Sequence, residues 1–111
     1  MTRFDLVPAA IAARARLQRT PVLSPGVNGM TLGRLVLLRR GHERSEKLIA
    51  HELVHVRQWA ELGVPRFLVC YLRTYLLGLV RLHSHRRAYL AIPLEEEARR
   101  ETAAWVARTG A

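Results

Sequence analysis

A chain of 111 residues, of which 50% are hydrophobic, is long enough to bury one core. Nothing in the composition marks a second unit, so we expect one domain over residues 1–111. The formal net charge of +9 comes from 18 basic and 9 acidic residues. The basic residues are spread over every segment, without a helix-turn-helix or zinc-knuckle pattern, so we do not expect a nucleic-acid-binding protein. An acidic substrate or an anionic membrane surface would suit such a charge.

The N-terminal apolar run at residues 6–13 is brief and contains Pro8. Asp5 precedes it and arginines follow it at once, which does not suit a secretory signal peptide. We therefore predict a short helix here, on the surface or packed against the core. The single cysteine, Cys70, cannot form an internal disulfide, so the fold does not depend on an oxidising compartment. Together these features predict a cytoplasmic protein.

The next segment, residues 20–29, contains prolines, glycines and an Asn-Gly step, which are typical of turns. Strands should flank it. Residues 30–38, rich in Leu and Val, are the best strand candidate, and residues 39–41 lead from it toward the following helix.

The most informative motif is His-Glu-x-x-His at residues 51–55, inside a segment (residues 45–62) with helical hydrophobic periodicity. Residues four apart lie one turn above each other on a helix, so His51 and His55 can bind one metal ion together. The carboxylate of Glu52 can take a proton from a water molecule at the metal, which is the general-base role of this spacing in metallopeptidases. Two exposed histidines on an ordinary surface helix are the alternative, which the helical setting weakens.

A catalytic zinc ion normally has three protein ligands and one open position, so a third ligand must come from elsewhere. The metzincin extension, His-x-x-Gly-x-x-His, is absent after residue 55. A carboxylate on a later helix is favoured, because Cys70 suits a buried apolar position and the two later histidines suit a solvated turn. The full set of candidates is Cys70, His83, His85, Glu95, Glu96 and Glu97.

The segment at residues 66–82 has too many apolar residues for one narrow helical stripe, so a helix here must be covered. Arg73 lies in its middle, and no uncharged run approaches the length of a transmembrane helix. Core packing combined with self-association as a homodimer is favoured over contact with a membrane surface.

Three segments, residues 33–41, 51–58 and 88–98, resemble small bacterial gluzincin-type metallopeptidases of the minigluzincin kind. The resemblance extends over residues 30–105. It implies an α+β zincin-like domain, with a short N-terminal sheet or hairpin, an active-site helix, a long apolar helix and a C-terminal glutamate helix. It also implies that residues 35–38 form the rim strand of the cleft, to which extended substrate adds. An ordinary half-buried strand is the alternative for these residues.

The same resemblance implies a ligand set. By the Glu-x-Glu-Ala pattern, Glu97 is the third ligand, and Glu101 one turn later buttresses a ligating histidine. Two departures from the family pattern are visible: 42 positions separate His55 from Glu97, which is longer than usual, and no histidine follows Glu97.

The function that these residues predict is zinc-dependent hydrolysis of a peptide or protein substrate, with Zn²⁺ on His51, His55 and Glu97 and with Glu52 as the general base. Tyr89, eight residues before Glu97, is a candidate hydrogen-bond donor to the oxyanion, and an ordinary core or interface tyrosine is the alternative. A zinc-binding latent or regulatory protein with little peptidase activity is the second hypothesis. An arginine-rich binding module without metal is the third.

Overall fold

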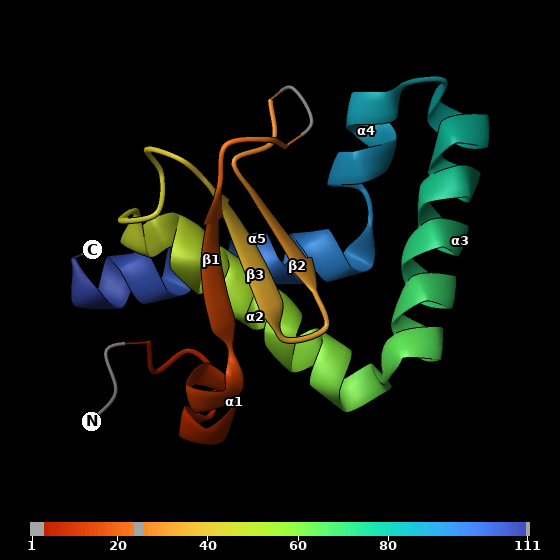
Figure 1. Ribbon diagram of the computed structural model, residues 1–111. Helices are drawn as coiled ribbons and strands as arrows, with labels where there is room; N and C mark the ends of the chain where they lie inside the picture. The colour runs from red at the N-terminus through yellow and green to blue at the C-terminus, as the bar shows by residue number, and fades with distance from the viewer. Residues whose placement is uncertain (1–3, 24–25, 111) are drawn as a thin grey trace.

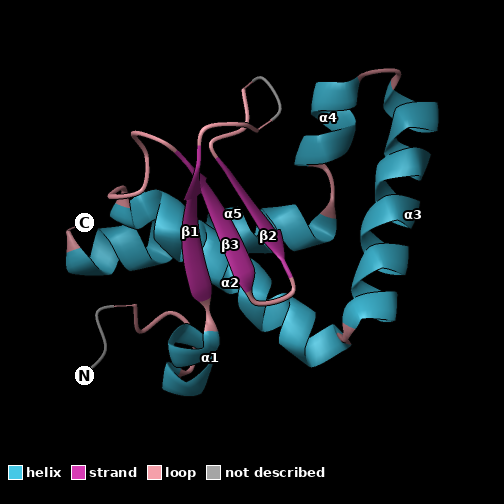
Figure 2. Cartoon of the chain, viewed as in Figure 1, coloured by secondary structure: helices cyan, strands magenta, loops and turns pink. Residues whose placement is uncertain are grey.

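The computed structural model describes residues 4–23 and 26–110 of the chain. It confirms an α+β fold, in which a three-stranded mixed sheet precedes the long helices (Figures 1 and 2). The described elements are α1 (Ala9–Arg14), β1 (Arg16–Thr20), β2 (Gly29–Leu32), β3 (Leu35–Arg39), α2 (Glu46–Leu62), α3 (Val64–Leu82), α4 (His85–Leu90) and α5 (Pro93–Thr109).

The sheet has the order β1-β3-β2, with β1 parallel and β2 antiparallel to the central β3. The prediction of one strand over residues 30–38 was wrong, because the chain reverses at Gly33 and forms two strands. Gly33 has φ +65°, a left-handed conformation that glycine adopts without a steric penalty. The turn segment at residues 20–29 is flanked by strands as predicted, although Ser24 and Pro25 lie outside the described residues.

The core lies between the sheet and α2. Val36 and Leu38 of β3, two residues apart, point to the same face and are fully buried against α2. Helix α2 presents Ile49, Leu53 and Val54 to them. In Figure 1, α2 and α5 both lie behind the sheet as it is viewed. The His-Glu-x-x-His motif therefore lies on a helix that packs against the sheet through the core.

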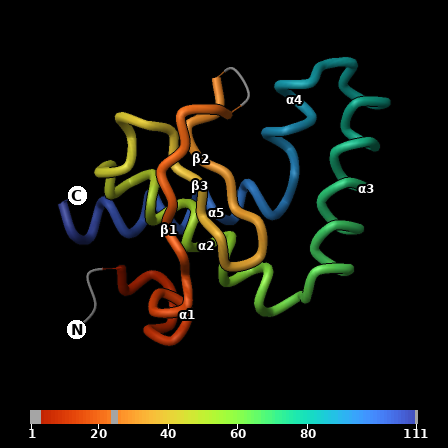
Figure 3. The backbone as a smooth tube through the Cα atoms, in the orientation of Figure 1, coloured from red at the N-terminus to blue at the C-terminus, as the bar shows by residue number. Residues whose placement is uncertain are grey.

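Helix α2 covers the predicted segment and has defined ends. Ser45 is its N-cap, with a side chain that accepts a hydrogen bond from the backbone N–H of Leu48. It ends at Gly63, whose φ of +78° changes the chain direction, and α3 leaves at an angle of 116° (Figure 3). This bend places α3 away from the sheet and leaves a space beside the motif.

Helix α3 has the predicted extent, but the expectation that it packs in the core was wrong. Phe67 is its only buried residue, among side chains that the structure describes. The helix contacts α4 closely, since Gly78 lies against the buried Ala88 and Tyr75 bonds to His85. No single helix in the described ranges is long and apolar enough to span a membrane. Within the same residues, the bent pair of α2 and α3 is the one combination that has the length and apolar composition of a span.

Helix α5 runs along α2 and buries Glu95, Ala98, Thr102 and Trp105. These four residues are spaced by three, four and three positions, so they form one stripe on the helix. Trp105 is nearly fully buried and stacks on Phe4 with the ring centroids 5.5 Å apart. The stripe therefore carries one charged residue, Glu95, into the interior.

Shortening the core strand tests this packing. We predict that Leu38→Ala lowers the free energy of unfolding by about 2–5 kcal/mol, because the side chain is fully buried and leaves a cavity. Leu17→Ala, the same change on a strand residue that is 49% exposed, should lower it by less than about 1 kcal/mol. Urea unfolding followed by circular dichroism measures both, and equal losses would contradict the assignment of the core.

Candidate metal centre

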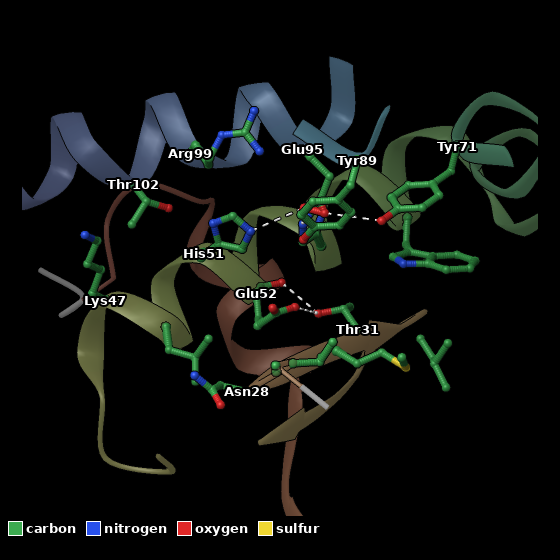
Figure 4. Close-up of a pocket in the computed structure, with 18 of the residues that line it drawn as sticks. Asn28, Thr31, Lys47, His51, Glu52, Tyr71, Tyr89, Glu95, Arg99 and Thr102 are labelled. Atoms are coloured by element: carbon green, nitrogen blue, oxygen red, sulfur yellow. Dashed lines mark hydrogen bonds and ion pairs between the residues drawn. The ribbon is translucent and has the colours of Figure 1, made fainter. Parts of the chain in front are cut away.

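His51, His55 and Glu95 converge at one point between α2 and α5. The Nε2 atom of His55 lies 2.7 Å from Oε1 of Glu95, and Nε2 of His51 lies 3.4 Å from the same oxygen. Three potential ligand atoms, one from each residue, all lie within 4.8 Å of one another. The group is largely buried, with His51 partly open to the cleft (Figure 4).

The third member of this group corrects the predicted ligand set. Glu97 does not face the histidines, because two residues along a helix correspond to a rotation of about 200°. Its carboxylate instead accepts hydrogen bonds from Arg57, at 2.5 Å, and from Gln58, at 2.8 Å. Glu95 occupies the position that the resemblance assigned to Glu97, whereas Glu96 is exposed.

The predicted buttress, Glu101, also lies on the other face of α5. It is one helical turn from Glu97 and accepts two hydrogen bonds from Arg57, at 2.7 and 3.0 Å. The group that contacts a histidine is Gln58, whose Oε1 accepts a hydrogen bond from Nδ1 of His55 at 2.7 Å. The Gln58 amide also donates to the backbone carbonyl of Leu94, which fixes its orientation. Gln58 therefore directs Nε2 of His55 toward Glu95.

The charges of the group are strongly coupled. Burial raises the pKa of Glu95, but hydrogen bonds from His51 and His55 outweigh this effect and hold the pKa well below its usual range. Burial lowers the pKa of His55, but the hydrogen bond and the charge of Glu95 raise it by more. The carboxylate is thus ionised, as a divalent cation requires, whereas the raised pKa of His55 means that a cation must displace the Nε2 proton of this imidazole in order to bind.

Glu52 lies next to the group and is held from the sheet side. Its carboxylate accepts a hydrogen bond of 2.7 Å from the hydroxyl of Thr31, which also contacts the Glu52 backbone carbonyl. Gly29 passes so close that a Cβ atom there would lie 3.1 Å from Oε1 of Glu52. The start of β2 thus restricts the position of the predicted base.

A cleft of about 1000 Å³ opens beside these residues. Its sheet-side wall is β2, which is the edge strand of the sheet on the side of the cleft. The prediction that residues 35–38 form the rim was wrong, because they belong to β3, which has a partner on both sides. The opposite wall is formed by α3 and α4 and contains Phe67, Tyr71 and Tyr89.

Two phenols face Glu95 across the cleft (Figure 4). The hydroxyl of Tyr71 donates to Oε2 of Glu95 at 3.4 Å, and Tyr89 lies beside the same carboxylate. Burial, reinforced by the charge of Glu95, raises the pKa of both Tyr71 and Tyr89 far above the usual value. Both groups therefore keep their protons at neutral pH and can act as hydrogen-bond donors.

The remaining ligand candidates lie outside the group. Cys70 is half-buried on α3 in a separate shallow hollow. His83 is an exposed residue that ends α3 in a left-handed conformation. His85 lines the cleft but is bound by the hydroxyl of Tyr75.

Sequence reasoning missed Gln58, Thr31 and Tyr71, and it named Glu95 as a candidate ligand but preferred Glu97. A signal for Glu95 was present in the apolar and small residues of the last helix, because Ala98, Thr102 and Trp105 continue a stripe that begins at Glu95. The position of Gln58, three residues after His55, places it on the same helix face. No local pattern indicated Thr31 or Tyr71, since their role depends on the packing of β2 and α3 around α2.

The elements described so far can be compared with known protein families. Residues 11–63 match the model of the eCIS core domain. The matched domain covers slightly less than half of the chain and runs from α1 to the end of α2. It includes His51, Glu52 and His55 but stops before Glu95. No curated protein and no solved structure gives a significant match.

The chemistry of the donor set fits a zinc ion. Two imidazole nitrogens and one carboxylate oxygen form one of the ligand sets that zinc takes in hydrolytic sites, with a further position left for water. Gln58 supplies the outer hydrogen bond that commonly orients a metal-binding histidine. The residues matched by the eCIS core domain supply His51 and His55, and the chain after them supplies Glu95, so together they form a His-His-Glu group that could hold a metal.

Three glutamate variants test the ligand assignment. We predict that Glu95→Gln weakens Zn²⁺ binding at least about 100-fold, because it removes a ligand as well as its charge. Glu97→Gln should lower the Zn²⁺ affinity no more than about tenfold, because Glu97 contacts Gln58, which in turn contacts His55. Glu96→Gln, at an exposed position, is the matched control and should leave the affinity unchanged.

Titration calorimetry of the folded variants measures these affinities. A larger loss for Glu97→Gln than for Glu95→Gln would contradict the assignment.

Proposed function

We propose that this protein is a zinc-dependent peptidase of the gluzincin type. The observation that carries the proposal is the convergence of His51, His55 and Glu95, with the carboxylate of Glu52 beside them and an open cleft in front. A structural zinc site usually has four protein ligands, whereas three ligands with access from a cleft suit a hydrolytic site.

A zinc ion on these three residues would acidify water and polarise a substrate carbonyl. The residues of the chain would carry the proton transfers. Glu52 accepts the proton of the attacking water and delivers it to the amine that leaves. The hydrogen bond from Thr31 orients Glu52 for this role without neutralising it.

The phenols of Tyr89 and Tyr71 are the candidates for stabilising the oxyanion. Both line the cleft next to Glu95, and both remain protonated for the reasons given above. A donor placed on that side can bond to the oxygen that gains charge when the carbonyl is attacked. They would take over the role of the histidine that gluzincins of larger size keep after the glutamate ligand.

The edge strand β2 suits an extended peptide. Met30, Thr31 and Leu32 line the cleft. Because β2 is an edge strand, the side of it that has no neighbouring strand is open to backbone pairing with a substrate. A peptide added there would lie between β2 and the tyrosines, with its carbonyl groups close to the metal group.

The direct test is Glu52→Gln. The variant should keep its Zn²⁺ affinity within a few-fold and lose at least about 100-fold in kcat, because the metal ligands stay and the proton acceptor is lost. The assay uses a quenched fluorescent peptide library, with a chelator-treated sample as the control. If the chelator-treated wild type and the Glu52→Gln variant both still cleaved peptides at the rate of the untreated wild type, the proposal would be refuted. Tight zinc binding with no cleavage of any peptide would instead favour the latent or regulatory protein.

Thr31 provides a finer test, since it acts through Glu52. Thr31→Val keeps the shape of the side chain and removes the hydrogen bond, so kcat should fall about tenfold. KM and zinc stoichiometry should stay unchanged, and Thr31→Ser should restore most of the activity. A Thr31→Ser variant as slow as Thr31→Val would show that the hydroxyl is not the relevant group.

A further inference from the structure

Helix α3 exposes more large apolar side chains than any other described element. Five of them form a continuous surface, which we call the α3 stripe: Leu68, Val69, Leu72, Leu76 and Val80. Their exposed fractions run from 43% to 71%. Scattered apolar residues on a surface need no explanation, but a contiguous set on one element marks a binding site.

The stripe follows from helical spacing. Leu68, Leu72, Leu76 and Val80 are each four residues apart and lie along one line of the helix, with Val69 on the adjacent line. The opposite side of α3 carries Phe67, which packs against α2. Figure 1 shows α3 at the edge of the molecule. The side chains of the stripe are exposed, so a partner surface can reach them.

The charge around the stripe has one sign. Between Glu61 and Glu95 the sequence contains no acidic residue. It contains five arginines in the same interval, at positions 66, 73, 81, 86 and 87, all of them exposed. The surface that α3 and α4 present is therefore apolar and cationic together.

A second copy of the chain fits this surface poorly. Pairing two α3 helices through the stripe would place Arg66 and Arg73 of one copy near the same cationic residues of the other, with no acid on either helix to pair with them. The complementary surface is one that takes up apolar side chains and carries negative charge over a broad area. An anionic lipid bilayer has both properties.

We propose that α3 docks the protein onto anionic membrane surfaces. The helix lies in the plane of the interface, with the stripe among the upper acyl chains and with its arginines extended to lipid phosphates. Arg73, in the middle of the helix, would be costly to place at the centre of a bilayer and is well placed in an interfacial orientation. Leu68 and Leu72 also line the cleft, so docking holds the cleft mouth next to the lipid.

The experiment measures binding of the full chain to vesicles by flotation. Vesicles of phosphatidylcholine with about 30% phosphatidylglycerol, which imitate an anionic leaflet, are compared with vesicles of pure phosphatidylcholine. We expect binding to the anionic vesicles at least about tenfold tighter, with a decrease as salt is raised. Cys70, the only cysteine, accepts an environment-sensitive dye on α3, whose emission should shift to the blue on binding.

Two matched pairs of double variants locate the contact, and all eight substitutions are at exposed positions. Leu76→Ser with Val80→Ser should weaken binding about tenfold, whereas Leu17→Ser with Val22→Ser should not. Arg66→Gln with Arg73→Gln should also weaken it about tenfold, whereas Arg16→Gln with Arg34→Gln, with the same loss of charge, should change it less than about twofold. Circular dichroism and zinc stoichiometry confirm that each variant is folded.

Three outcomes would overturn the proposal. One is equal binding to both kinds of vesicle or to neither. Another is an equal loss for an α3 pair and its matched control, which would indicate net charge alone. The third is a dimer in sedimentation velocity that becomes a monomer on Leu76→Ser with Val80→Ser, which would assign the stripe to a second copy. None of these readouts depends on peptidase activity.

Discussion

The packing of α5 along α2 is the constraint on which the site depends. It brings Glu95 to within 2.7 Å of His55 and holds three ligand atoms together in a largely buried position. An ionised carboxylate is costly to bury without partners, so the two imidazoles are needed to keep it there. The same contact that would bind a cation therefore also determines how the last helix sits on the fold.

The glutamates of α5 have different partners because they lie on different faces of the helix. Glu95 lies on the stripe that enters the interior, while Glu97 and Glu101 lie one turn apart on the other face and bind Arg57. Gln58 joins the two sides, because it contacts His55 with its oxygen and Glu97 with its nitrogen. The residues matched by the eCIS core domain supply both histidines, Glu52 and its partner Thr31, and the remainder of the chain supplies Glu95 and both phenols.

Local signals in the sequence predicted the elements well. The motif helix and the apolar helix after it were correctly placed, because their periodicity and their Gly and Pro boundaries are local properties. The last helix was expected from the family resemblance. The turn at Gly33 was missed, because apolar residues on both sides of Gly33 and Arg34 suited one continuous strand. Glu97 was chosen from a sequence resemblance. The direction of each glutamate side chain is instead set by the buried stripe of α5 that packs along α2, and Glu95 belongs to this stripe. The exposure of α3 could not be read from composition, because it depends on the bend at Gly63.

The central claim is that one zinc ion is bound by His51, His55 and Glu95. The most direct measurement is a crystal structure of the zinc-loaded protein with anomalous data at the zinc absorption edge. The account predicts a single strong anomalous peak about 2.0–2.2 Å from Nε2 of both histidines and from a carboxylate oxygen of Glu95, with a solvent ligand on the cleft side. A peak bound to Glu97, or no peak between α2 and α5, would contradict it.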